Sequence, residues 1–425
     1  MKEGYLSNYF EGVAAKRLSV VEVDPDVSNQ HEFNGVSQLR EMLGKYREEY
    51  PATFAYFGED EAEKIIIPGR VTWYDARENH PTRTEYRLYY TDNEAVTHAR
   101  SSDLIIIAKV RGRNELFVII AKAGTIFDNQ LMWLFKLPQD LTATQSSFIN
   151  QPEEVIDSRE VEIVARQVLD ELGIEIQDDR ADNFLEKILD KFGRRFPTTA
   201  EFSAFARSTM PEANPIDDPD SALLDWLNRE ELLFRTLERY LLKEELMNGF
   251  VTNGEADVDK FIKFSLSVQN RRKSRAGQAL ENHLAVIFDE HRINYTRGAR
   301  TENKSTPDFL FPGIEEYRNS LFPVTQLTML GVKSSCKDRW RQVLSEAARI
   351  DAKHLLTLQA GISEDQTTEM RANKLQLVLP KRIHETYTDA QQEWIVDVSQ
   401  FISEVARKQT IHHDSASRTS FFIPD

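Results

Sequence analysis

The hydrophobic residues of this 425-residue chain change their spacing near residue 150, and this change constrains the fold more than any other feature of the sequence. Before that point, short β-branched and aromatic runs recur at roughly even spacing, as in KIIIPGRVTWYDAR, TEYRLYYT, SDLIIIAKVRG and NELFVIIAKAG. Such runs are typical of strands in a small barrel or sandwich. From residue 151 the apolar residues recur at helical spacing instead. A β-rich N-terminal domain is therefore expected before a part of different architecture.

The second part of the chain mixes helical and strand patterns. Helices are expected at 153–173, from Thr198 or Thr199 onward, at 217–250, at 258–269 and 275–291, at 338–350 and near 390–407. Strands are expected in PDFLFPG, LTMLGVK, HLLTLQ and LQLVLP. We therefore predict four segments, namely a β domain at 1–145, an acidic helical connector at 146–194, a helix-and-strand domain at 195–407, and a loose tail at 408–425.

The composition is that of a soluble globular protein, with 40% apolar and 29% charged residues. The N-terminal residues MKEGYLSNYF lack the apolar stretch of a secretory signal, and no apolar run approaches the ~20 residues of a membrane span. The single cysteine excludes an internal disulfide framework and a multi-cysteine zinc site. These features predict a cytoplasmic protein without a membrane partner.

The net charge of −16 argues at first against nucleic acid as a partner, but its distribution weakens that argument. Residues 150–192 hold thirteen acids and five bases, a net of −8 and so half of the total. The run NRRKSRA at 270–276 has four bases and no acid. Because salt screens distant charges within roughly 8 Å, a local basic surface can still bind phosphates.

Four charged residues in the second part form a pattern that suits phosphodiester hydrolysis. Asp308 and Lys333 each lie at the end of a short apolar run, so neighbouring strands can bring them together. Glu346 follows thirteen residues after Lys333, at the border of an apolar helical arc, and Glu281 borders a similar arc on an earlier helix. Carboxylates hold Mg²⁺, which activates water, and a lysine can stabilise the charge of the transition state. Taken singly, each residue has a simpler explanation, since Pro-Asp is common in turns and glutamates at helix borders are usually solvated.

The surrounding segments resemble the catalytic half of the EcoRII-like type II (type IIE) restriction endonucleases. SVQNRRKSRAGQALENHL, KSTPDFLFPG, MLGVKSSCKDRWRQVLSEAARI and HLLTLQAGIS stand in the family's order and at similar spacing, and the similarity extends from about 195 to 405. The resemblance implies a restriction-endonuclease-like core, a mixed sheet flanked by helices. It places the family's catalytic residues at Asp308, Lys333, Glu346 and Glu281, with Asp308 and Glu346 as Mg²⁺ ligands.

The same resemblance implies how DNA is read. In the family, the cluster after the catalytic lysine reads the two halves of a CC…GG palindrome, here CCNGG-like, and this cluster falls on Lys337, Asp338 and Arg339. Lysine and arginine can donate to guanine O6 and N7, and aspartate can accept from cytosine N4. The implied partner is double-stranded DNA, cleaved to leave 5′-phosphates by a homodimer that matches the two-fold target. A cognate methyltransferase in the same restriction-modification system is implied genetically.

Two further groups of basic residues are candidate DNA contacts. The run NRRKSRAG offers Arg271, Arg272 and Arg275 as phosphate contacts. Residues 14 to 120 resemble more weakly the family's effector domain, a DNA-binding β pseudobarrel that can bind a second DNA site as an allosteric effector. Its candidate contacts are Lys16, Arg17, His31, Arg77, Arg83 and Arg87.

Two other functions stay open from the sequence. A repair or structure-specific nuclease on the same core would cut without a defined palindrome. A DNA-binding regulator that has lost catalysis would bind without cutting, although it would have no need to retain all four of the charged residues.

Overall fold

The computed structural model describes residues 10–24, 26–27, 31–35, 37–59, 63–138, 141–142, 147–149, 162–172, 174, 182–252, 255–336 and 339–419. The chain divides into two compact units, one of Met1–Glu175 with Ala360–Glu364 and one of Ile176–Gln359 with Asp365–Asp425. We refer to them as unit 1 and unit 2. Within the described residues, no helix combines the length and the apolar character that a membrane span requires.

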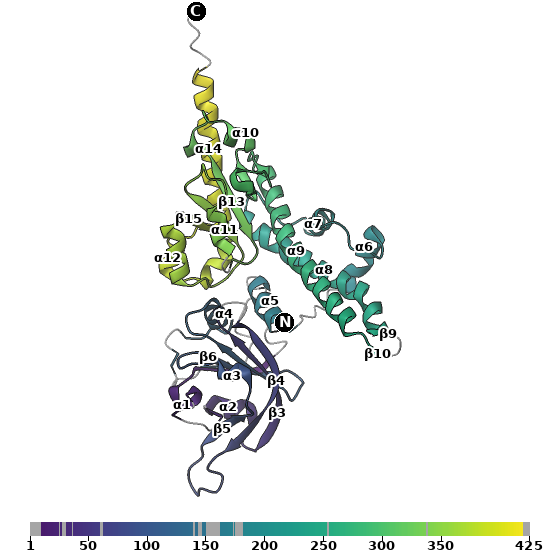
Figure 1. Ribbon diagram of the computed structural model, residues 1–425, viewed down its shortest axis with the longest axis vertical. Helices are drawn as coiled ribbons and strands as arrows, with labels where there is room; N and C mark the ends of the chain where they lie inside the picture. Colours follow the sequence, from purple (N-terminus) through teal and green to yellow (C-terminus); the bar gives the residue numbers. More distant parts are fainter. Residues whose placement is uncertain are drawn as a thin grey trace, which may run out of the picture. The chain divides into compact units, whose positions relative to one another are not determined.

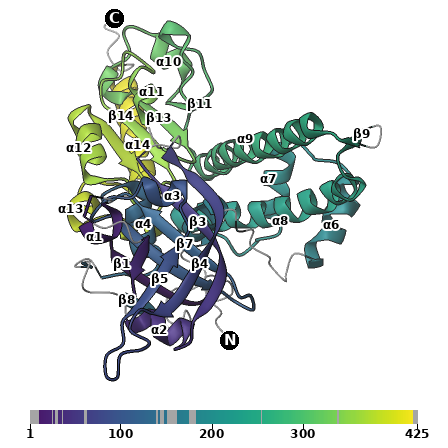
Figure 2. The ribbon, with the colours of Figure 1, turned by 60° about the horizontal axis from the view of Figure 1, so that its bottom comes forward.

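Unit 1 is built on one curled sheet of eight strands, in the order β2-β5-β4-β3-β7-β6-β1-β8 (Figures 1 and 2). Neighbouring strands are antiparallel except β3 and β7, which are parallel. The strands are β1 Phe10–Arg17, β2 Glu32–Asn34, β3 Glu48–Phe57, β4 Ile65–Asp75, β5 Tyr86–Tyr90, β6 Leu104–Val110, β7 Leu116–Ala121 and β8 Ser147–Ile149. The helices are α1 Val20–Val23, α2 Ser37–Leu43, α3 Glu94–Thr97, α4 Ile126–Leu134 and α5 Glu162–Glu171. The strands predicted in the four β-branched runs are confirmed as β4, β5, β6 and β7.

Alternation along the strands builds the core of unit 1, because successive side chains of a strand point to opposite faces. In β3, the side chains of Tyr50 and Phe54 are buried in the same cluster. Trp73 of β4 is fully buried there, and its indole N–H donates to the carbonyl of Gly44 at 3.0 Å. The indole therefore ties the turn after α2 to the sheet while its single polar atom is satisfied.

Unit 2 begins with a helical layer. Its helices are α6 Asp182–Phe192, α7 Thr199–Ser208, α8 Pro219–Asn248 and α9 Val258–Glu290, with the short strands β9 Val251–Thr252 and β10 Glu255–Ala256 between the last two. The cap predicted at Thr198 is confirmed, since its hydroxyl accepts from the Glu201 N–H at 3.3 Å. The predicted stop after α8 is also confirmed, with Gly249 at a φ of 69°. Aromatic and aliphatic residues of α6, α7 and α8 form one buried cluster.

The prediction of two helices at 258–269 and 275–291 is wrong, because α9 runs unbroken from Val258 to Glu290 (Figure 2). The basic run between the two predicted helices contains no proline, and arginine and lysine are good helix formers. The only glycine nearby, Gly277, lies in ordinary helical backbone. One helix therefore carries both the basic run and Glu281.

The second half of unit 2 is a mixed sheet of five strands in the order β11-β12-β13-β14-β15. β11 Thr296–Arg297, β12 Phe309–Phe311 and β13 Thr328–Lys333 are antiparallel, whereas β14 Lys353–Thr357 and β15 Leu375–Val378 continue from β13 in parallel. The strands predicted in PDFLFPG, LTMLGVK, HLLTLQ and LQLVLP are confirmed as β12, β13, β14 and β15. Phe288 of α9 packs edge-on against Phe309 and Phe311, with ring centroids 5.2 and 5.3 Å away, and so joins the helix to the sheet.

The remaining elements are α10 Ile314–Arg318, α11 Trp340–Leu344, α12 Glu364–Ala372, α13 Asp389–Gln392 and α14 Val398–Thr419, with 3₁₀ turns at Glu302–Lys304, Val324–Gln326 and Lys381–Thr386. The predicted helix 338–350 is therefore too long. It ends at Leu344, and it could not in any case continue through Ala347, whose φ of 47° is left-handed. The predicted terminal helix extends further than expected, to Thr419, into the segment predicted to be a loose tail.

Candidate active site

Asp308 and Lys333 meet where β12 and β13 run side by side. Asp308 directly precedes β12, and Phe309 stands opposite Leu330 in the antiparallel ladder. The Asp308 carboxylate accepts from the backbone N–H of Val332 at 2.6 Å and from the Lys333 ammonium at 2.8 Å. The predicted juxtaposition of these two residues, 25 apart in sequence, is thus present. Both side chains remain partly exposed, at 17% and 20%, so water and a substrate can reach them.

Glu346 lies on the turn that follows α11, and not on a helix as the sequence suggested. Its backbone N–H bonds to the Val343 carbonyl at 3.1 Å, one residue before the left-handed turn at Ala347. One carboxylate oxygen, Oε2, is buried without a hydrogen-bond partner. Burial raises the pKa of Glu346 to about 7; the charge of Asp308 acts in the same direction, and Lys333 and Lys353 oppose it. The turn therefore places an acid that is hard to ionise within electrostatic range of the Asp308–Lys333 pair.

Glu281 reaches the same region from α9. Burial raises the pKa of Glu281, and the negative charge of Asp308 raises it further, so the two carboxylates lie within electrostatic range of each other. Arg297 of β11 donates to Glu281 Oε2 from Nε at 3.0 Å and from Nη2 at 2.9 Å. A helix, two strands and a turn thus bring the four predicted residues to one end of the sheet.

The carboxylate oxygens of the site suit a hard divalent cation, although the acidic side chains are too far apart to bind one as a group of three. Among the described residues, no group of three histidine, cysteine, aspartate or glutamate side chains is close enough to hold a metal ion. The partnerless oxygen of Glu346 and the exposed part of the Asp308 carboxylate are oxygen donors of the kind that Mg²⁺ prefers. Mg²⁺ usually takes one or two protein carboxylates and completes its shell with water and substrate oxygens, which fits these two residues.

Of the predicted base-reading cluster, the described residues include only Arg339, while Lys337 and Asp338 lie outside them. Arg339 is exposed, and its Nη2 lies 3.3 Å from the Ser335 hydroxyl. It lies six positions after Lys333, the last residue of β13. The neighbouring Cys336 is buried.

The three arginines predicted to contact phosphate have partners inside unit 2. Arg272 donates to the buried carboxylate of Glu238 at 2.6 Å, and Arg271 stacks over the ring of Phe196 at 4.2 Å. Arg275 donates to the Pro197 carbonyl at 2.9 Å, and burial lowers the pKa of its guanidinium. These contacts fasten α9 to its neighbouring helices and favour a structural role over the phosphate contact that the charge run suggested.

Most of the candidate DNA contacts in unit 1 are also held in ion pairs. Lys16 is 4% exposed and pairs with Glu22, which favours a structural role over the DNA contact that was predicted for it. Arg17 pairs with Asp128 at 2.7 Å, and Arg77 and Arg87 both pair with Glu85. Arg83 is exposed on the segment between β4 and β5.

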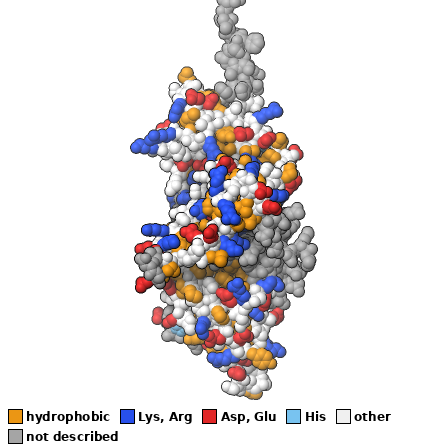
Figure 3. All heavy atoms as spheres, turned by 90° about the vertical axis from the view of Figure 1, so that its right-hand side faces the viewer, with side chains coloured by type: hydrophobic (Ala, Val, Ile, Leu, Met, Phe, Trp, Pro, Cys, Tyr) orange, Lys and Arg blue, Asp and Glu red, His pale blue; other side chains and the backbone are white. Residues whose placement is uncertain are grey.

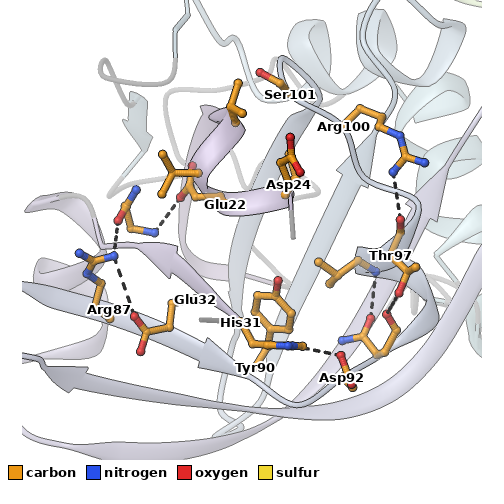
Figure 4. Close-up of a pocket in the computed structure, with 16 residues that line it drawn as sticks. Glu22, Asp24, His31, Glu32, Arg87, Tyr90, Asp92, Thr97, Arg100 and Ser101 are labelled. Atoms are coloured by element: carbon orange, nitrogen blue, oxygen red, sulfur yellow. Dashed lines mark hydrogen bonds and ion pairs between the residues drawn. The ribbon is translucent and has the colours of Figure 1, made fainter. Parts of the chain in front are cut away.

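His31 and Arg87 line a cavity of about 930 Å³ in unit 1 (Figure 4). His31 lies 3.0 Å from Asp92, and Arg87 lies 3.9 Å from Glu32. The acids Glu22 and Asp24 line the same cavity. With four acids and the bases His31, Arg87 and Arg100, the lining does not have the positive excess expected of a phosphate-binding surface.

Two residues of the site escaped the sequence analysis. Arg297 sits in the run NYTRGAR, which carries no recognisable pattern. Lys353 is 7% exposed and donates from Nζ to the Ile350 carbonyl at 2.6 Å, close enough for its charge to act on Glu346. Its place as the first residue of a buried strand was the one available sign, because a lysine is rarely buried unless it is paired.

Comparison with known proteins confirms the resemblance for the C-terminal part of the chain. Residues 234–402 match the protein family described as EcoRII C terminal, and this range includes Glu281, Asp308, Lys333 and Glu346. The type II restriction enzyme EcoRII of Escherichia coli is 42% identical over 212 residues, which is 50% of this chain and 51% of that enzyme. The chain thus spans about half the length of the curated relative that it matches.

Two solved structures show weaker similarity. One is described as metal-depleted Ecl18kI in complex with uncleaved, modified DNA, with a TM-score of 0.43, 16% identity, and coverage of 58% of this chain and 87% of that one. The other is described as a restriction endonuclease PspGI–substrate DNA complex, with a TM-score of 0.43, 14% identity, and coverage of 51% and 95%. Similarity of this degree does not establish a shared fold.

Proposed function

We propose that this protein is a type II restriction endonuclease, an enzyme that hydrolyses phosphodiester bonds of double-stranded DNA at a defined sequence. The observation that carries the proposal is the meeting of Asp308, Lys333, Glu346 and Glu281 at one end of a mixed sheet, within the range that matches the EcoRII C-terminal family. Neither fact alone would suffice, because family membership does not guarantee an intact site and charged clusters also occur for structural reasons.

Three of the four residues, Asp308, Glu346 and Lys333, have a proposed part in the reaction. Asp308 and Glu346 would hold Mg²⁺, which lowers the pKa of a bound water and offsets charge on the phosphate. Lys333, already 2.8 Å from Asp308, would orient the attacking water and donate to a phosphate oxygen as its charge develops. Glu346 must ionise to bind a cation, so cation binding near neutral pH releases a proton from this residue.

The target and the assembly are proposed from the same family. Lys337, Asp338 and Arg339 would read a CC…GG palindrome of the CCNGG type, and a homodimer would match its two-fold symmetry. The products would carry 5′-phosphates. A protein with this role works beside its host's DNA, which fits a cytoplasmic location and a cognate methyltransferase.

The described residues on the face of the molecule drawn in Figure 3 form no continuous basic surface. On the face drawn in Figure 3, Lys and Arg side chains are interspersed with Asp and Glu side chains. Local pairing of this kind reduces non-specific attraction to phosphates and leaves specificity to contacts at base edges.

For unit 1, we propose the effector role that the weaker resemblance implies, a β pseudobarrel that binds a second DNA site. The curled eight-stranded sheet supports this proposal. The ion pairs of Arg17, Arg77 and Arg87 oppose it at those positions, and the exposed Arg83 is left as the best-placed candidate.

The experiment is a digest of unmethylated plasmid carrying several CCNGG sites, with and without Mg²⁺, followed by sequencing of the fragment ends. Discrete Mg²⁺-dependent cuts beside a CC…GG palindrome are expected, and the same DNA methylated at these sites should resist cutting. Cuts without a common sequence would replace the proposal with a repair nuclease. Tight binding of the plasmid without any cut would indicate a DNA-binding regulator.

A further inference from the structure

Arg297 makes more contacts with the candidate active site than any pattern in the sequence indicates. Its guanidinium bridges two consecutive residues of α9, donating to Glu281 Oε2 from Nε and Nη2 and to Asn282 Oδ1 from Nη1 at 2.8 Å. A guanidinium that uses all three of its nitrogen atoms in this way is fixed in orientation. The Glu281 carboxylate is fixed with it.

The strand that carries Arg297 also holds the backbone of Asp308. Arg297 stands opposite Phe309 in the ladder between β11 and β12, and the next residue, Gly298, donates its N–H to the Asp308 carbonyl at 3.0 Å. Two adjacent residues thus place two acids of the site, Glu281 through a side chain and Asp308 through the backbone.

Hydrogen bonds also connect Asn282, one of the partners of Arg297, to helix α7. Asn282 Nδ2 donates to the Ser203 hydroxyl at 3.2 Å, and that hydroxyl donates to the Thr199 carbonyl at 2.8 Å. Ser203 is fully buried on α7. The amide of Asn282 is therefore held on one side by α7 while its oxygen receives Arg297 on the other.

We propose that Arg297 is a positioning residue for DNA cleavage, which acts through Glu281 by holding its carboxylate beside Asp308. The proposal rests on the proposed nuclease function. Two carboxylates in electrostatic range repel each other, and an unpaired Glu281 would turn away from Asp308 toward solvent. A direct contact between Arg297 and DNA is disfavoured, because its Nε, Nη1 and Nη2 are already engaged with α9.

The test is a double-mutant cycle with Arg297→Met, Glu281→Gln and both together, with Arg297→Lys as the conservative variant. Single-turnover cleavage of a CCNGG duplex in Mg²⁺ gives the rate, and binding of the same duplex in EDTA gives the affinity. We expect Arg297→Met to slow cleavage about 10–100-fold with DNA affinity within about threefold, and Arg297→Lys to recover part of the rate. In the Glu281→Gln background, Arg297→Met should cause no further loss, since the two residues act as one unit.

Arg235 provides the matched control, because it pairs with Glu231 one turn away on α8 in the same unit. Arg235→Met should leave the cleavage rate unchanged, and urea unfolding of every variant checks that the fold is retained. Losses that multiply in the double variant, or a fall in DNA affinity of more than tenfold, would overturn the proposal. If the wild type cuts DNA and Arg297→Met cuts it equally fast, the role of Arg297 is overturned and the nuclease function stands. If the wild type cuts no DNA, the proposed nuclease function is overturned as well.

Discussion

Two acids of the candidate site differ sharply in their immediate surroundings. Asp308 receives hydrogen bonds from Lys333 and from the Val332 N–H, whereas one oxygen of Glu346 is buried with no partner. A carboxylate oxygen that is buried without a hydrogen-bond partner disfavours the charged form of its acid. Without a cation, Glu346 is therefore, together with Glu281, a residue through which pH acts on this site.

The stability of the protein in EDTA should reflect this difference. The pKa of Glu346 is raised from 4.5 to about 7, so the folded state holds the proton more tightly than the unfolded state does. The free energy of unfolding then falls as pH rises from about 4.5 to about 7, by roughly 1–2 kcal/mol after allowance for partial exposure. Urea unfolding at pH 5 and pH 8 should show this fall for the wild type and a smaller one for Glu346→Gln. An equal fall in both proteins would assign the effect to other groups.

Asp308→Asn should separate cleavage from binding. The amide oxygen can still accept the Val332 N–H, so the fold is kept, but the negative charge that faces Lys333 and would bind the proposed cation is lost. We expect single-turnover cleavage to slow by about 10³-fold or more, with DNA affinity in EDTA nearly unchanged. Asp351→Asn is the control, because this exposed aspartate pairs with Lys374 on the surface. Retention of cleavage by Asp308→Asn would remove Asp308 from the proposed site.

At the level of elements, the site depends on how closely α11 packs on the sheet. A Cβ placed on Gly331 of β13 would stand 2.9 and 3.0 Å from the two methyl groups of Val343 on α11. Glycine is therefore required for this close approach. The turn with Glu346 follows α11 directly. The contact between Gly331 and Val343 therefore also determines how far the Glu346 carboxylate lies from β13.

Gly331→Ala should push α11 away from β13. We expect a loss of about 1–3 kcal/mol in the free energy of unfolding, together with slower cleavage. Gly277→Ala is the matched control, since a Cβ there meets nothing within 4 Å and lies in a helix, so it should stabilise by about 0.5–1 kcal/mol. Adding Val343→Ala to Gly331→Ala should remove part of the overlap, and a double variant no better than the single one would show that the contact is not the cause.

Local patterns predicted which elements exist better than where they end. The strands around Asp308 and Lys333 were predictable because short apolar runs bounded by turn residues are specific signals. The end of α11 was not, because Trp340, Val343, Ala347 and Ile350 are all buried at helical spacing although the helix stops at Leu344. Burial continues through successive tight turns there, and spacing alone cannot distinguish them from a helix.

The basic run shows the same limit for function. Its charge suggested phosphate contact, but the partners of Arg271, Arg272 and Arg275 are a buried glutamate, a carbonyl and aromatic rings contributed by distant segments. No local pattern can reveal a partner that is remote in sequence. Arg297 was missed for the corresponding reason, since its role depends on a residue of α9 sixteen positions earlier.

For the whole molecule, the division into two units indicates where a truncated protein should begin, and this boundary differs from the one that the sequence indicates. The connector predicted at 146–194 would place a cut near residue 190, just before the predicted helix-and-strand domain. However, Ile188 and Phe192 of α6 are buried against Phe202 and Leu233 in unit 2. Removal of α6 residues up to 190 would take away part of that cluster.

We therefore expect residues 176–425 to fold and, if unit 1 restrains cleavage until it binds a second DNA site, to cut single-site plasmid faster than the full chain. A chain of residues 191–425 should be less stable by about 2–5 kcal/mol, because it lacks the buried Ile188. Cleavage of one-site and two-site plasmids by the three proteins provides the measurement. Unchanged or lost activity in a folded 176–425 chain would contradict restraint by unit 1.

The unbroken course of α9 has a mechanical consequence. One continuous helix carries Arg271 and Arg272, which contact Phe196 and Glu238, and Glu281, which lies at the candidate active site. The two arginines lie about 15 Å from Glu281 along the helix axis. Because the helix has no break, a tilt at one end moves the other end. A change in how Arg271 and Arg272 pack therefore displaces Glu281. Substitutions of Glu238 or Phe196, the partners of these two arginines, are thus expected to alter the cutting rate with little change in DNA affinity.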